Sequence, residues 1–144
     1  MGKLTSLKTL SSVIFGSAIF DLFGGFYFIL LVGVGKQIAD PPTHTFFAVL
    51  LGTFLICFAY LQFMTARNIK RYFVCIGVAL LSRIFYVFLF AYYYLVAQVN
   101  LTAFLPTAIA DFLWVILIVV LVALNREVSL KELYVPKGIK EIIK

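Results

Sequence analysis

Four runs of mostly apolar residues, each about twenty residues or longer, take up most of this chain of 144 residues. The hydrocarbon core of a bilayer is about 30 Å thick, and about 20 helical residues at about 1.5 Å each can cross it. The runs therefore predict an all-α integral membrane protein, a four-helix bundle that runs up, down, up and down. The predicted spans are Ser11–Val34, Phe46–Ala66, Tyr72–Ala97 and Ala103–Leu124.

The composition supports lipid as the main solvent of the protein. The chain is 64% hydrophobic and 12% charged, whereas soluble domains are typically about 45–50% apolar and about 25% charged. A soluble monomer of this size has too little interior to hide so many apolar side chains. A soluble enzyme and a nucleic-acid-binding domain are excluded, and the lipid bilayer is the expected partner. The runs lack the period-two alternation of the strands of a membrane barrel.

The basic residues indicate how the bundle is oriented. Ten of the twelve lysines and arginines lie before the first run, between the second and third, or after the fourth: Lys3, Lys8, Arg67, Lys70, Arg71, Arg126, Lys131, Lys137, Lys140 and Lys144. Lys36 lies in a connection on the other side, and Arg83 lies inside a run. The positive-inside rule then predicts that both termini and the middle loop are cytoplasmic.

The chain divides into a bundle and a tail. Residues 1–127 are predicted to form the four-span bundle, and residues 128–144 a basic cytoplasmic tail. Near the end, Ile139, Ile142 and Ile143 alternate with charged residues. This pattern allows either a short interfacial helix on the anionic inner leaflet or a solvated tail.

Three charged residues lie within the predicted spans, namely Asp21, Arg83 and Asp111. A charge near the bilayer centre costs roughly 2.5–3.5 kcal/mol on insertion scales, so such side chains face the bundle interior and find partners. At about 1.5 Å per residue, Asp21 and Arg83 lie about 15 and 16 Å into their spans from one side, and Asp111 about 12 Å from the other. We therefore predict a buried Asp21–Arg83–Asp111 cluster that links the first, third and fourth helices.

Two further side chains are predicted to complete this site. Tyr86 and Trp114 each lie about one helical turn from a charged residue and carry a hydrogen-bond donor that suits a carboxylate. Gln62, in the second span, is interpreted as a hydrogen-bonding residue between helices. Small residues at Ser17 and Gly24–Gly25 share a face with Asp21 and allow close helix packing.

The cluster has two interpretations that the sequence leaves open. It is either a structural ion-pair clamp that sets helix order and register, or a polar site for proton coupling or for the head group of a ligand.

Other chemistry has little support in the sequence. His44 is the sole histidine and lies in a predicted outer loop, and Cys57 and Cys75 do not form a C-x-x-C pair. Both cysteines are interpreted as small, buried apolar residues. We expect no catalytic residue, no metal and no cofactor.

Three short features resemble small four-helix bacterial membrane proteins of the DoxX-like type, which include relatives known only as domains of unknown function. They are Leu51-Gly52 running into Ala66-Arg67, the lone cation Arg83 in the third span, and Ala110-Asp111-Phe112-Leu113-Trp114 in the fourth. The resemblance covers roughly residues 11–124. It implies the cytoplasmic membrane of a bacterium or archaeon, and an accessory role beside a quinone-linked oxidoreductase.

The leading functional hypothesis is a non-enzymatic accessory or scaffold subunit of a membrane complex. The alternatives are a small transporter or proton-coupled carrier, or a protein that binds an apolar ligand, each using the Asp21–Arg83–Asp111 cluster. An integral membrane enzyme is the weakest alternative, because only carboxylates and tyrosines are available for chemistry.

Overall fold

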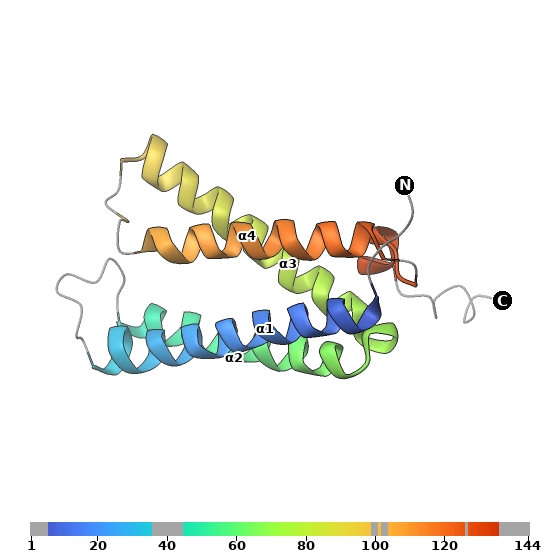
Figure 1. The fold of residues 1–144 in the computed structure, drawn as a ribbon. Helices are drawn as coiled ribbons and strands as arrows, with labels where there is room; N and C mark the ends of the chain where they lie inside the picture. Colours follow the sequence, from blue (N-terminus) through green and yellow to red (C-terminus); the bar gives the residue numbers. More distant parts are fainter. Residues whose placement is uncertain (1–5, 36–44, 99–100, 102–103, 126, 136–144) are drawn as a thin grey trace.

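The computed structural model describes residues 6–35, 45–98, 101, 104–125 and 127–135, and helices make up most of them (Figure 1). Four helical segments are each long and apolar enough to cross a membrane. The first and third begin as α-helices and end as wider π-helices. The helices are α1 (Leu7–Phe26) with η1 (Tyr27–Val34), α2 (Thr45–Arg67), α3 (Ile69–Ala91) with η2 (Tyr92–Val96), α4 (Leu105–Ala123) and the 3₁₀-helix η4 (Leu130–Leu133).

The helix boundaries lie within four residues of the predicted spans, and the largest differences are at two helix starts. α1 begins at Leu7 rather than Ser11, because the Ser6 hydroxyl accepts a hydrogen bond from the backbone N–H of Thr9 at 3.2 Å. α3 begins at Ile69 rather than Tyr72, with Asn68 as its cap. The predicted starts followed the apolar runs, whereas polar caps let both helices begin earlier, outside the apolar runs.

The helices run alternately in opposite directions (Figure 1). α1 and α2 lie side by side, α4 runs along the other side of the molecule, and α3 crosses between them. The far end of α3 and η2 diverge from the rest, and none of the η2 side chains is buried. α1 begins and α4 ends at the same end of the bundle, as the up-down-up-down prediction requires.

Two glycines allow α1 and α2 to pack closely. A Cβ atom at Gly25 would lie 2.8 Å from the carbonyl oxygen of Gly52, and one at Gly52 would lie 2.6 Å from the carbonyl oxygen of Gly25. Real Cβ atoms do not approach backbone oxygen this closely, so only glycine fits at either position. The small-residue face predicted around Asp21 thus packs on α2.

The main hydrophobic core lies at the end of the bundle where α1 begins. Its fully buried side chains include Leu10, Ile14, Ile76 and Leu80. Val128 and Leu133 from the predicted tail also belong to this core, so residues 127–135 pack on the bundle. Ile139, Ile142 and Ile143 lie outside the described residues.

A smaller cluster lies toward the opposite end, where Phe28, Val32 and Ala48 pack with Phe104. The rings of Phe28 and Phe104 stack at a centroid distance of 5.6 Å. The charged residues of the spans lie between these two apolar clusters.

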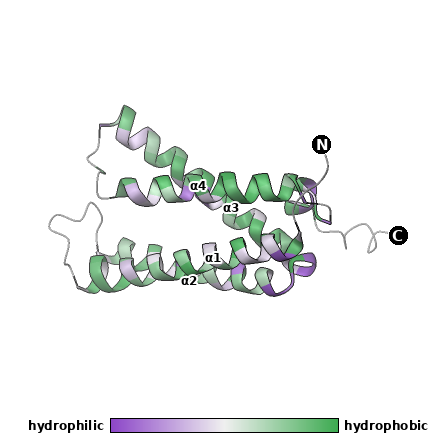
Figure 2. Ribbon diagram, viewed as in Figure 1, coloured by the Kyte–Doolittle hydropathy of each residue, from purple (hydrophilic) through white to green (hydrophobic). Residues whose placement is uncertain are grey.

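Large apolar side chains also lie exposed on the outside of the helices, and hydrophobic residues predominate along the length of each long helix (Figure 2). Phe23 and Phe88, for example, are each 70% exposed. An aqueous surface of this kind is unfavourable, whereas the same side chains are well solvated by lipid tails.

Candidate functional site

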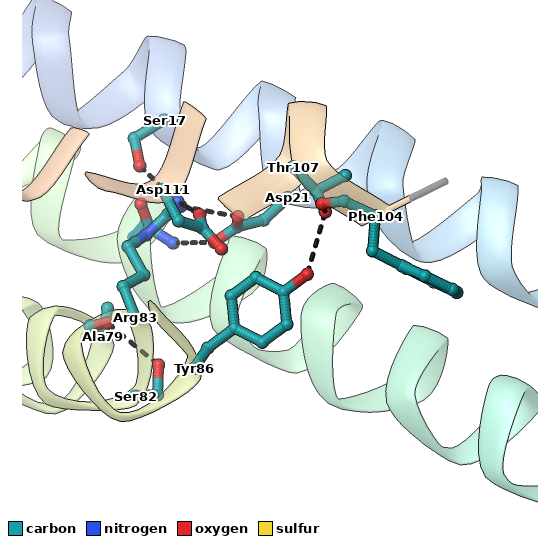
Figure 3. Close-up of polar contacts among 10 residues, drawn as sticks. Ser17, Asp21, Ala79, Ser82, Arg83, Tyr86, Phe104, Thr107 and Asp111 are labelled. Atoms are coloured by element: carbon teal, nitrogen blue, oxygen red, sulfur yellow. Dashed lines mark hydrogen bonds and ion pairs between the residues drawn. The ribbon is translucent and has the colours of Figure 1, made fainter. Parts of the chain in front are cut away.

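Arg83 lies at the centre of the bundle and pairs with both predicted carboxylates (Figure 3). Its Nη2 donates to Asp21 Oδ1 at 2.5 Å, and its Nη1 donates to Asp111 Oδ1. Nη2 also donates to Ser17 Oγ at 2.9 Å. The Arg83 and Asp21 side chains are 5% and 4% exposed, so this pair is buried, whereas Asp111 is 14% exposed. The structure thus brings together the three charges that the depth argument placed at one level.

Gln62 connects α2, the remaining long helix, to this cluster. Its Nε2 donates to the second carboxylate oxygen of Asp21, and the side chain is fully buried. The sequence indicated Gln62 as a hydrogen-bonding residue between helices, but it did not identify Asp21 as its partner. The sequence signal for Gln62 was a side-chain amide inside an apolar run. Its partner Asp21 follows only from how α1 and α2 pack together. All four long helices therefore contribute to one polar cluster.

Tyr86 and Trp114 do not bond the carboxylates as predicted. The Tyr86 hydroxyl lies 2.9 Å from the Thr107 hydroxyl, which donates to the Phe104 carbonyl at 2.7 Å (Figure 3). The indole of Trp114 packs near Phe20, with ring centroids 6.4 Å apart. A spacing of one helical turn brings a side chain near a charge, but side-chain direction decides which group it meets.

The charges in the cluster do not balance. One guanidinium faces two carboxylates, which leaves one negative charge in excess when all three groups are ionised. Both oxygens of Asp21 accept hydrogen bonds, from Arg83 and from Gln62. Asp111 accepts from Arg83 through Oδ1 alone, and within the described part of the chain Oδ2 has no hydrogen-bond partner. We therefore assign the excess negative charge to Asp111, whose Oδ2 has no hydrogen-bond partner among the described residues.

A cavity of about 130 Å³ adjoins the cluster. From the three charged residues it extends toward the end of the bundle where η1 and η2 lie, because the lining residues Gly24, Phe28, Tyr86 and Thr107 lie on that side of the charges. Its apolar walls include Phe20, Phe28, Leu51, Leu55 and Phe58. Its polar lining consists of Asp21, Arg83, Asp111, Ser82, Tyr86 and Thr107. The cavity is therefore apolar along its walls and charged at one end, an arrangement typical of sites that orient small ligands.

The remaining candidates from the sequence lie away from this site. Cys57 is exposed on the outside of α2, so the prediction that it is buried is wrong, and Cys75 is partly exposed. The prediction failed because a small apolar residue is equally compatible with lipid and with the core. His44 lies outside the described residues. Within those residues, no group of three or more His, Cys, Asp or Glu side chains is placed to hold a metal ion.

Comparison of the chain with protein-family models, with curated proteins and with solved structures finds no match. The resemblance to DoxX-like proteins therefore stays a prediction.

Proposed function

We propose that this chain is a multi-pass membrane protein that binds a small amphipathic molecule inside its helical bundle. The observation that carries the proposal is the cavity beside Arg83, which combines apolar walls with a charged end. A structural clamp needs the ion pairs alone. The adjoining cavity, and an Asp111 oxygen that no described residue bonds, are features that suit a ligand site and that a clamp does not need.

The surface of the bundle supports its place in a membrane. The described lysines and arginines other than Arg83 all lie at the end where α1 begins and α4 ends, as the hydrophilic ends in Figure 2 indicate. The long flanks between the two ends are apolar. We propose that the basic end faces the cytoplasm, in line with the positive-inside rule.

A role as an accessory or scaffold subunit is a second proposal. The observation that favours it is η2, which packs on α3 and leaves the side chains of Tyr92–Val96 exposed. Such a projecting apolar segment suits either lipid or a neighbouring membrane protein. Transport is a further proposal that uses the same cavity and requires in addition that the cavity open to both sides of the membrane.

Ligand binding is tested by filling the cavity. Gly24 lines it, and a Cβ atom there would come no closer than 3.6 Å to another side chain, at Leu55 Cδ1. Gly24→Leu is therefore expected to fold and to occupy the cavity. Phe23→Leu, which changes a neighbouring side chain that is 70% exposed, is the matched control.

The measurement is native mass spectrometry of protein purified in a mild detergent. We expect a co-purifying small molecule on the wild type and on Phe23→Leu, and its loss from Gly24→Leu. If none of the three proteins carries a small molecule, or if Gly24→Leu retains it, the cavity is not the binding site.

A further inference from the structure

We infer that the molecule bound in this cavity is a small organic cation, such as a protonated amine on an apolar body, whose charge pairs with Asp111. This inference rests on the proposed ligand-binding function and adds the chemical class of the ligand.

The charge balance selects against anions. The ionised cluster carries two carboxylates and one guanidinium, and the guanidinium already contacts both carboxylates. An anion in the cavity would add a second excess negative charge beside three charged side chains that are each at most 14% exposed. A monovalent cation instead brings the site to zero net charge, and among side chains so little exposed the electrostatic difference between a bound cation and a bound anion is large.

The hydrogen-bonding inventory favours a donor on the ligand. Asp111 Oδ2 is an acceptor that has no partner within the described residues, and Asp111 lines the cavity. Thr107 gives its single hydroxyl hydrogen to the Phe104 carbonyl, so the Tyr86 hydroxyl must be the donor in the bond between them. The lone pairs of the Tyr86 oxygen therefore remain as acceptors. An ammonium group carries up to three donors and no acceptor, which suits this pair.

The walls and the volume define the rest of the ligand. Phe28, Phe58 and Tyr86 present aromatic rings to the cavity, and aromatic faces attract cations. A volume of about 130 Å³ is close to the roughly 150 Å³ of an engineered cavity that holds benzene. The cavity therefore suits one six-membered ring or a short alkyl chain with a single ammonium group.

The test compares three probes that share one apolar body and differ in charge. Benzylammonium, benzyl alcohol and benzoate are titrated at neutral pH into the purified protein in an uncharged detergent. Binding is followed by calorimetry and by the fluorescence of Trp114, the sole tryptophan, which packs on the cavity residue Phe20. We expect benzylammonium to bind about tenfold or more tightly than benzyl alcohol, as a charge-assisted hydrogen bond predicts, and benzoate to bind weakest.

Two variants assign the preference to its source. Asp111→Asn keeps the shape of the side chain and removes the excess charge, so it should abolish the preference for benzylammonium and leave the affinity for benzyl alcohol unchanged. Gly24→Leu fills the cavity and should abolish binding of all three probes.

Each contrary outcome has a defined meaning. If benzyl alcohol binds the wild type as tightly as benzylammonium, or if Asp111→Asn keeps the preference, the cation inference is overturned while ligand binding stands. If benzylammonium binds Gly24→Leu normally, it does not occupy the cavity and the inference is also overturned. If no probe binds and no molecule co-purifies with the wild type, both the inference and the proposed function fail.

Discussion

Arg83→Leu is expected to destabilise the bundle far more than Asp111→Asn does. Removing the guanidinium leaves the buried Asp21 and the largely buried Asp111 without their cation, and Ser17 loses its donor. Breaking a buried ion pair by removing one partner typically costs about 3–5 kcal/mol. Because Arg83 serves two carboxylates, we expect a loss at the upper end of this range, about 5 kcal/mol.

Asp111→Asn has a different effect because it removes the charge that is in excess. The pair between Arg83 and Asp21 remains, with Nη2 and Oδ1 2.5 Å apart. The asparagine oxygen can still accept a hydrogen bond from Nη1 of Arg83. The hydrogen bond from Arg83 Nη1 to residue 111 becomes weaker, which lowers stability. The loss of the excess negative charge raises stability and offsets this effect. We therefore expect a change within about 1 kcal/mol.

The assay is unfolding in mixed micelles of a mild detergent and increasing dodecyl sulfate. Trp114 fluorescence reports the transition, since its ring packs across the interface between α4 and α1 against Phe20. A triple variant with Arg83→Leu, Asp21→Asn and Asp111→Asn serves as the control and should recover most of the stability lost in Arg83→Leu, because it contains no unpaired charge.

Equal destabilisation by Arg83→Leu and Asp111→Asn would refute this reasoning, since it would mean that the second carboxylate is as necessary as the guanidinium. No recovery in the triple variant would refute it as well, because the loss would then come from packing rather than from charge.

Three further predictions concern packing and hydrogen bonding. Gly25→Ala should lower the free energy of unfolding by about 1–3 kcal/mol, because its Cβ would lie 2.8 Å from the backbone of α2. The control Gly24→Ala should change the free energy of unfolding by less than about 0.5 kcal/mol. Equal losses for the two variants in the same micelle titration would contradict the close packing of α1 and α2. Gly77→Ala should detach η4 from α3, because the added Cβ would overlap the carbonyl oxygen of Leu133. Trypsin should then cleave the η4 segment faster than it does in the wild type. An unchanged cleavage rate would contradict the packing of η4 on α3. Tyr86→Phe should lower stability by about 0.5–1.5 kcal/mol, since one hydrogen bond to a hydroxyl of α4 is lost, and a larger loss would show that the hydroxyl has a second partner.

The four helices were predictable because their signal is local. Each run must be long enough and apolar enough to cross a bilayer, and both properties can be counted along the chain. The contact of Arg83 with Asp21 and Asp111 was predictable for a related reason, since depth in a membrane follows from residue number, and charges at one depth seek partners.

The partners of uncharged polar groups were not predictable in the same way. Tyr86 bonds Thr107 rather than a carboxylate, and Gln62 bonds Asp21 through an approach of α1 to α2 that two glycines permit. These contacts depend on the rotation of each helix about its axis. A chain surrounded by lipid gives a weak signal for that rotation, because apolar residues occupy the lipid-facing and the buried sides alike.

The amino-acid sequence by itself determined that this protein has four apolar helices, which of their ends are basic and that three charges lie at one level along them, because length, hydropathy and charge are properties of each segment alone. Only the tertiary structure decided that a cavity adjoins Arg83 and that one oxygen of Asp111 has no hydrogen-bond partner among the described residues. Empty space and unmet hydrogen bonds arise from how several helices pack together, and no single segment of the chain specifies them.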